Sequence, residues 1–303
     1  MYEQIASNKR KTIFLLFVSF LLLAAVGYAI GLIYGTGWLG LGIAVAVALL
    51  LQIGSYFSGD KLVLASARAR AVTVEEEPRL HNIVEGLAIA AGVPKPAVYV
   101  VPEQAPNAFA TGRDPEHSSV AVTQGLLETM NRVELEGVLG HEMSHVVDRD
   151  ILYSTIVATV IGAIVLISEF FLRSWWWGGI GGRRSDRGNG NGGGLELILF
   201  AIGFAFLILA PFFGQLIRLA VSRNREYLAD AQGAMLTRYP PGLISALKKI
   251  AEAPHAMRSA NNATAHLWFD QPSRIQGPRT GKMERLFSTH PPIEERIRRL
   301  EEM

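Results

Sequence analysis

The sequence contains no cysteine, only 7 histidines among its 303 residues, and only 18% charged residues. The absence of cysteine excludes disulfide bonds and thiolate metal ligands, so any metal must be bound by histidine and carboxylate groups. The net charge is only +2, and no basic patch with interleaved aromatic residues is present, so no nucleic-acid partner is expected. By contrast, half of the residues are hydrophobic and the mean hydropathy is positive, which favours a membrane protein.

Two long apolar runs near the start of the chain predict a transmembrane hairpin. Residues 12–34 and 38–57 contain no charged residue and are separated by a short Gly-Thr-Gly turn. A membrane core about 30 Å thick needs about 20 helical residues, so each run is long enough to span it. A cleaved signal peptide is the alternative for the first run. That run is longer than a typical signal sequence, however, and no small-residue cleavage site precedes the second run.

Two later apolar runs, residues 151–172 and 195–219, predict a second transmembrane hairpin. Three tryptophans at 175–177 follow the first of these runs, and they suit the interfacial belt of a membrane protein. Residues 178–194 are rich in glycine, asparagine and arginine and read as a linker that cannot pack a core. The alternative is a hairpin buried inside a soluble domain, which the length of the two runs disfavours.

The orientation in the membrane follows from the basic residues that flank the first hairpin. They lie at positions 9–11 and at 61, 68 and 70, whereas the turn between the two runs carries no charge. The positive-inside rule therefore places both outer ends, and both chain termini, in the cytoplasm. Arginines at 183, 184 and 187 would then face outward, against the same rule, but the first hairpin usually dominates the orientation.

These runs divide the chain into four parts. Residues 1–60 form the N-terminal transmembrane hairpin, and residues 61–150 form the first part of a soluble domain. Residues 151–219 form the second hairpin with its linker, and residues 220–303 form the second part of the soluble domain. The expected fold class is a mainly α membrane protein with four transmembrane helices and a cytoplasmic α+β domain.

The first part of the soluble domain has its own pattern of expected elements. Residues 75–91 predict an amphipathic helix that ends at Gly92. Residues 97–101 and 119–123 predict short strands, and residues 107–112 between them predict a turn. The second of these strands is a candidate edge along which an extended substrate binds as an added strand.

The motif that carries chemistry is a His-Glu-x-x-His pattern formed by His141, Glu142 and His145. It lies on a helix expected over residues 131–150, with Asn131 as its N-cap. Residues four apart share a helix face, so the two imidazoles can bind one zinc ion, and Glu142 can take a proton from the attacking water. With so few histidines, chance alone would give the pattern in about one such chain in a hundred.

A catalytic zinc site needs a third protein ligand, and Glu226 is the predicted one. It lies early in a helix that follows the fourth apolar run, and Asp230 shares its helix face. Asp230 is placed to accept a hydrogen bond from the far nitrogen of a zinc-bound histidine. His145 precedes the third run, and Glu226 follows the fourth, by about 10 Å of helix each, so an antiparallel pair would bring both to one height above the membrane. A surface ion pair is the alternative for Glu226 and Asp230.

Four segments, in their order along the chain, resemble those of HtpX-type membrane zinc proteases, which are related to the CAAX-prenyl endopeptidases. The segments are Asn107-Ala108-Phe109-Ala110-Thr111-Gly112, His141-Glu142-x-x-His145, Arg225-Glu226-x-x-Ala229-Asp230 and Ser288-Thr289-His290-Pro291. The resemblance covers nearly the whole chain, including the four apolar runs. It implies a zincin-like (gluzincin) metalloprotease domain with Glu226 as third zinc ligand and Asp230 behind a zinc-bound histidine.

The resemblance also implies what the protein does and where. The expected activity is zinc-dependent endoproteolysis of unfolded or damaged membrane proteins, with one zinc ion per chain, as part of the envelope stress response and protein quality control. The expected location is the bacterial inner membrane, crossed several times, with the active site in the cytoplasm. His290 is the candidate donor to the oxyanion, and Asn107 the candidate ligand of the substrate backbone. A surface histidine and an ordinary turn are the respective alternatives.

Two other functions compete with a protease. One is a catalytically silent membrane scaffold or chaperone adaptor on the same fold, which the loss of a ligand or of the general base would favour. The other is a zinc hydrolase that acts on a non-peptide substrate. The remaining histidines have no partner at ligand spacing and are expected to be surface or packing residues: His81, His117, His255 and His266.

Overall fold

The computed structural model describes residues 2–33, 35–160, 162, 223–253, 257, 264–270 and 291–303. The chain divides into two compact units. One unit comprises residues 13–54 and 160–216, and the other comprises residues 1–12, 55–159 and 217–303.

The first two apolar runs form two long helices, α1 (Tyr2–Ile33) and α2 (Gly37–Ser66). Within the described residues, α2 is the one helix that is long and apolar enough to cross a membrane, with a mean hydropathy of 2.0 in its most apolar window. The predicted count of four transmembrane helices is therefore not confirmed. Of the second hairpin, the structure describes residues 151–160 and 162, and the rest of 151–219 lies outside the described residues.

Inside the smaller unit, α1 and α2 contact each other through polar as well as apolar groups. The side-chain amide of Gln52 donates a hydrogen bond to the backbone carbonyl of Leu16 at 2.8 Å. Near the turn, the rings of Tyr28 and Trp38 lie with their centroids 5.6 Å apart. A side-chain hydrogen bond to the neighbouring helix is a contact that persists where lipid replaces water.

The larger unit contains a four-stranded sheet in the order β1-β2-β4-β3. β2 (Ala97–Val101) and β4 (Ser118–Thr123) are parallel, and both were predicted as strands. β1 (Arg70–Ala71) pairs antiparallel with β2, and β3 (Ala108–Gly112) pairs antiparallel with β4. β4 therefore lies between two strands, and the prediction that it offers an edge to a substrate is wrong.

The end position in the sheet belongs to β3, for which a turn was predicted. That prediction was also wrong, because all five residues of β3 are buried and pair with β4 from Ala108 to Gly112. Asn107 and Gly112, which favour turns, flank four residues with no charge that fit a buried strand. Here the pairing with β4 outweighs the local turn signal.

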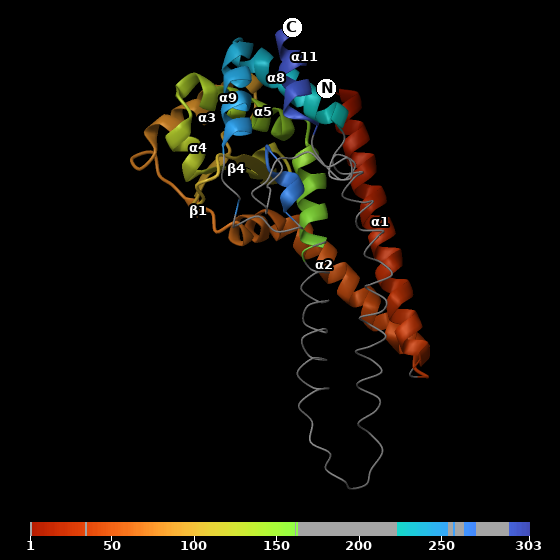
Figure 1. Cartoon of the computed structure of the whole chain (residues 1–303). Helices are drawn as coiled ribbons and strands as arrows, with labels where there is room; N and C mark the ends of the chain where they lie inside the picture. Colours follow the sequence, from red (N-terminus) through yellow and green to blue (C-terminus); the bar gives the residue numbers. More distant parts are fainter. Residues whose placement is uncertain are drawn as a thin grey trace, which may run out of the picture. The chain divides into compact units, whose positions relative to one another are not determined.

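Helices pack around this sheet (Figure 1). They are α3 (Pro78–Ala91), α4 (Gln124–Thr129), α5 (Arg132–Val147), α8 (Arg223–Thr237), α9 (Pro240–Glu252) and α11 (Ile293–Glu301), with single 3-10 turns at Pro115–His117 and Ala265–Leu267. The predicted stop of α3 at Gly92 is confirmed. Gly92 adopts a left-handed conformation with φ 69°, which glycine reaches without strain, and its N–H bonds the last carbonyls of the helix.

α5 carries the metal motif and is fixed at its start by a capping box. Asn131 accepts a hydrogen bond from the backbone N–H of Glu134 at 3.0 Å, and Glu134 accepts one from the backbone N–H of Asn131 at 2.8 Å. The predicted N-cap is thus confirmed. The helix ends at Val147, however, three residues earlier than predicted, and Arg149 has a left-handed φ of 56°. The next helix, Asp150–Val160, is separate from α5. The expectation that the helix of the metal motif continues directly into the third apolar run is therefore wrong.

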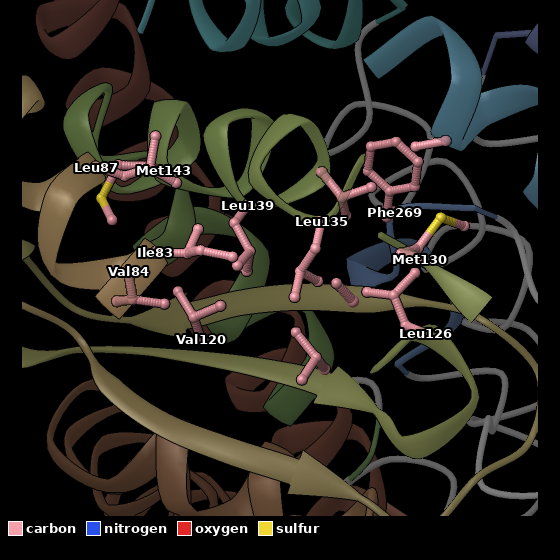
Figure 2. Close-up of a cluster of buried hydrophobic side chains, with 14 of the residues drawn as sticks. Ile83, Val84, Leu87, Val120, Leu126, Met130, Leu135, Leu139, Met143 and Phe269 are labelled. Carbon is pink, nitrogen blue, oxygen red and sulfur yellow. The ribbon is translucent and has the colours of Figure 1, made fainter. Parts of the chain in front are cut away.

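The apolar face of α5 determines where its metal motif points. Leu135, Leu139 and Met143 are almost completely buried and point toward β4 and α3 (Figure 2). His141 lies two positions after Leu139, and His145 lies two positions after Met143. Two positions correspond to about 200° around the helix. Burying each large apolar side chain stabilises the fold by about 1.5–3 kcal/mol, so the core holds the two histidines on the opposite face.

Candidate metal centre

The three predicted ligands converge in the structure. The Nε2 atoms of His141 and His145 lie 3.1 Å apart, and the carboxylate of Glu226 lies 3.7 Å from the first and 3.9 Å from the second. Two nitrogen or oxygen ligands of one tetrahedral zinc ion lie about 3.3 Å from each other, given bonds of about 2.0–2.1 Å. His141, His145 and Glu226 therefore form a group of the size that holds one metal ion.

A close helix crossing brings the two halves of this group together. His141 and His145 lie on α5, and Glu226 lies in the first turn of α8. A Cβ atom on Gly233 of α8 would lie 2.7 Å from the backbone nitrogen of His141, so only glycine fits at this crossing. The predicted placement of Glu226 beside the two histidines thus depends on a glycine in α8 and not on the apolar runs alone.

Each histidine has a carboxylate behind it. Nδ1 of His141 lies 2.8 Å from Asp230, as expected, and Nδ1 of His145 lies 3.0 Å from Asp150, which the sequence reasoning missed. A carboxylate accepts a hydrogen bond, so each Nδ1 carries the proton and each Nε2 presents a lone pair. Two lone pairs that face each other and a carboxylate repel unless a cation lies between them. The donor set therefore fits a divalent metal ion.

The charges around His145 support the same conclusion. Burial opposes a charge on this ring, but Asp150, Glu226 and Glu142 more than offset it and raise the pKa of His145 to about 10. His141, in contrast, is buried beside Arg296, and burial lowers its pKa to about 4 even with Asp230 in contact. The carboxylates near His145 thus attract positive charge, which a divalent cation supplies better than a proton.

Glu142, the predicted general base, is buried beside the same group. Burial, helped by the neighbouring Glu226, raises the pKa of its carboxyl group to about 7, although His145 and a backbone hydrogen bond from Ala110 oppose the shift. A base that exchanges its proton near neutral pH suits both removal of a proton from water and its later return. This environment, which no sequence pattern reveals, matches the predicted role.

Arg296 of α11 is the main residue that the sequence reasoning missed. Its side chain is only 1% exposed and forms hydrogen bonds to both oxygens of Asp230, from Nε at 2.8 Å and from Nη2 at 2.6 Å. The available signal was its spacing. Arg296 lies three residues after Ile293 and four before Leu300, which puts an arginine on the buried face of an otherwise charged helix.

A cavity of about 30 Å³ adjoins the metal group, which is room for a metal ion or a water molecule but not for a peptide. Its walls come from β3, α5, the helix Asp150–Val160, α8 and residues 266–269. His266 lines this cavity, and its Nε2 lies 3.1 Å from the carbonyl oxygen of Ser154. His81 is buried against the carbonyl of Val72, and His117 bonds Asp114 at the surface, as expected for packing and surface histidines.

The two remaining predicted site residues have different outcomes. Asn107 is buried, and its side-chain oxygen accepts hydrogen bonds from the backbone N–H groups of Ala108 and Asp270, both at 3.0 Å. Its amide nitrogen donates to the carbonyl of Asp270 at 2.7 Å. Asn107 thus binds backbone groups, but those of its own chain. His290 lies outside the described residues, as does His255.

Comparison with known proteins identifies relatives over the full chain. Residues 75–303 match the family described as Peptidase family M48. The chain is 48% identical to a "Protease HtpX homolog" of Thermoanaerobacter pseudethanolicus and 49% identical to one of Caldanaerobacter subterraneus, each over 100% of this chain and 98% of the relative. The crystal structure of S. mikatae Ste24p is similar with a TM-score of 0.52, at 18% identity over 99% of this chain and 67% of that chain. This last likeness concerns the fold.

Proposed function

The chain belongs to peptidase family M48 and is a metalloprotease, and from this premise we propose that it is a zinc-dependent endopeptidase of the bacterial inner membrane. Its proposed substrates are unfolded or damaged membrane proteins, cleaved at the cytoplasmic face as part of envelope quality control. The observation that carries the proposal is the convergence of His141, His145 and Glu226, with the buried Glu142 beside them.

His141, His145 and Glu226 would hold one zinc ion per chain through Nε2, Nε2 and a carboxylate oxygen. When bound, zinc polarises the scissile carbonyl and makes water a better nucleophile near neutral pH. Asp230 and Asp150 keep the two imidazoles in the tautomer that presents Nε2. The chain thereby supplies three ligands and leaves a fourth direction for water and substrate.

Glu142 performs the proton transfers. One of its carboxylate oxygens takes the proton from the attacking water and then gives it to the nitrogen of the leaving amine. Its pKa of about 7 lets it accept and release that proton at neutral pH. His290 stays the proposed donor to the oxyanion, an assignment that rests on the matching Ser-Thr-His-Pro segment alone.

The substrate backbone is proposed to bind along the outer side of β3. This strand ends the described sheet, and its Ala110 lines the cavity next to Glu142. The backbone N–H of Phe269 donates to the carbonyl of Ala108 at 2.8 Å, so the protein's own chain occupies the outer side of β3 at one end. A substrate strand would pair further along, toward Ala110. Asn107 remains a proposed substrate ligand.

The membrane part of the proposal rests on the apolar N-terminal helices. α2 has the length and hydropathy of a membrane span, and its C-terminal end leads directly into the unit that holds the metal group. A catalytic unit tethered in this way works close to the bilayer surface, where unfolded segments of membrane proteins are concentrated. The flanking basic residues support a cytoplasmic position.

The proposal is tested by digestion of casein and of an unfolded membrane protein with the detergent-solubilised full chain. We expect cleavage by the wild type, loss of cleavage in Glu142→Ala and after chelation, and recovery of the wild type when zinc is added. The matched control is Glu128→Ala, because Glu128 is an exposed carboxylate that accepts a hydrogen bond from Gln124 on its own helix. Activity that survives in Glu142→Ala would overturn the mechanism, and zinc binding without any proteolysis would favour a silent scaffold.

A further inference from the structure

The last helix of the chain reaches the metal group through one side chain. α11 is nine residues long and mostly charged at its surface, yet Arg296 points inward and is buried. A buried arginine is rare unless its charge is paired and its N–H groups are bonded. The partners of Arg296 therefore indicate what the residue does.

Arg296 holds Asp230 in one orientation. Nε donates to Oδ2 of Asp230 at 2.8 Å, and Nη2 donates to Oδ1 at 2.6 Å, so the ion pair is bidentate. Oδ1 also accepts the hydrogen bond from Nδ1 of His141 at 2.8 Å. The planar guanidinium thus fixes the carboxylate plane, and the carboxylate fixes the imidazole that it contacts.

The same guanidinium also supports the far side of the His141 ring. Nη1 donates to the carbonyl of Phe269 at 3.1 Å, and the guanidinium carbon lies 4.4 Å from the centre of the Phe269 ring. That ring packs edge-to-face against His141, with the centroids 4.8 Å apart. His141 is therefore enclosed between Asp230 and Phe269, and Arg296 contacts both.

We propose that Arg296 is a positioning residue for the metal centre, which acts through Asp230 to hold His141 with Nε2 directed at the metal. α11 is then a required part of the zinc site although it contributes no ligand. The inference rests on the proposed function only in taking His141 as a zinc ligand. A purely structural ion pair between α11 and α8 is the competing explanation, because it would stabilise the fold without affecting metal affinity.

A double-mutant cycle separates the two explanations. The zinc dissociation constant is measured by chelator competition in the full-length wild type, Arg296→Met, Asp230→Asn and the double variant, with thermal unfolding of each zinc-free protein as the measure of folding. We expect Arg296→Met to weaken zinc binding about 10- to 100-fold in the wild-type background. In the Asp230→Asn background we expect a much smaller further loss, because Arg296 acts mainly through Asp230 and only its contact with Phe269 remains. Losses that simply add would overturn the inference.

Two further variants keep the test decisive if Arg296→Met folds poorly. Arg296→Lys retains the positive charge but not the planar fork, and we expect it to fold and to bind zinc about 10-fold more weakly. Arg298→Met is the matched control on the same helix, because Arg298 is 57% exposed and, among the described residues, pairs with Glu295 and Glu302. Wild-type affinity in Arg296→Lys, or an equal loss in Arg298→Met, contradicts the inference. Zinc binding by a wild type that cleaves nothing contradicts only the proposed function.

Discussion

The residues on the two sides of the metal motif of α5 differ in how their buried charges are paired. On one side, which we call the inner cluster, His141 contacts Asp230 and Arg296, and all three side chains are almost completely buried. On the other side, Glu142, His145 and Asp150, which we call the pocket cluster, adjoin the cavity, and Asp150 contacts Nδ1 of His145. The inner cluster pairs its charges, whereas the pocket cluster gathers negative charge.

Because of this contrast, two carboxyl groups of one site differ in their pKa. Burial would raise the pKa of Asp230, but Arg296 and the hydrogen bonds to it lower that pKa to about 2. Burial and the neighbouring Glu226 raise the pKa of Glu142 to about 7, because the opposing effects of His145 and of the hydrogen bond from Ala110 are smaller. Asp230 therefore stays ionised as an anchor, while Glu142 is suited to exchange a proton. Opposite pKa shifts on neighbouring acids are a common sign of acid–base division in an active site.

The largest expected effect tests the raised pKa of Glu142 in the pocket cluster. In the metal-free protein, the pKa of Glu142 in the folded state is about 7 against 4.5 ordinarily, so folded-state stability is lost as the pH rises from about 4.5 through 7. At about 1.4 kcal/mol per pKa unit, the loss is about 3.5 kcal/mol. Glu142→Gln removes the titration, so we expect it to be about 2–3 kcal/mol more stable than the wild type at pH 8.

Unfolding of the zinc-free full chain at pH 4.5 and pH 8 measures this effect. The advantage of Glu142→Gln should be small at pH 4.5, where the wild-type carboxyl group is protonated. Glu128→Gln provides the control, because Glu128 is an exposed glutamate on α4. A variant less stable than the wild type at pH 8 would mean that the pocket cluster is already compensated and that the contrast between the two clusters does not hold.

A smaller effect concerns the two carboxylates behind the histidines. Asp230 and His141 are sealed from solvent, whereas the His145 side chain is 18% exposed and water can replace Asp150. We therefore expect Asp230→Asn to weaken zinc binding about 100-fold and Asp150→Asn about 10-fold, near the two ends of the usual range for such partners. Zinc competition in the two full-length variants gives the comparison. Equal losses, or the reverse order, would show that burial does not decide the value of these contacts.

The sequence predicted the parts of this site that depend on local spacing. The four-residue separation on α5 placed His141 and His145 on one face, and the same spacing on α8 placed Asp230 beside Glu226. Asp150 and Arg296 were missed because their roles depend on tertiary contacts. Asp150 reaches His145 only because α5 breaks at Arg149, and Arg296 reaches Asp230 across 66 residues of sequence.

The same limit applies to the fold. Core patterning located α3, α5 and two strands, since apolar periodicity is a local signal. Strand order is not, and so β3 was taken for a turn and β4 for an edge, whereas β4 lies inside the sheet. Residues that suit a turn or a strand equally are assigned by the partner that they meet.

The smallest expected effect tests whether the break at Arg149 matters for the pocket cluster. Arg149 has a φ of 56°, which costs a non-glycine residue about 1 kcal/mol, and it directly precedes Asp150. In Arg149→Gly, relief of this strain competes with the greater entropy of the unfolded chain, so we expect a stability gain of at most about 0.5–1 kcal/mol. Arg149→Val should lose about 1–2 kcal/mol, because a β-branched residue fits this conformation poorly.

Arg238→Gly is the control, since Arg238 has a similar φ of 53° but follows α8 at the end away from Glu226. If Arg149→Gly weakens zinc binding and Arg238→Gly does not, the backbone break itself positions Asp150, and the pocket cluster is as rigidly held as the inner cluster.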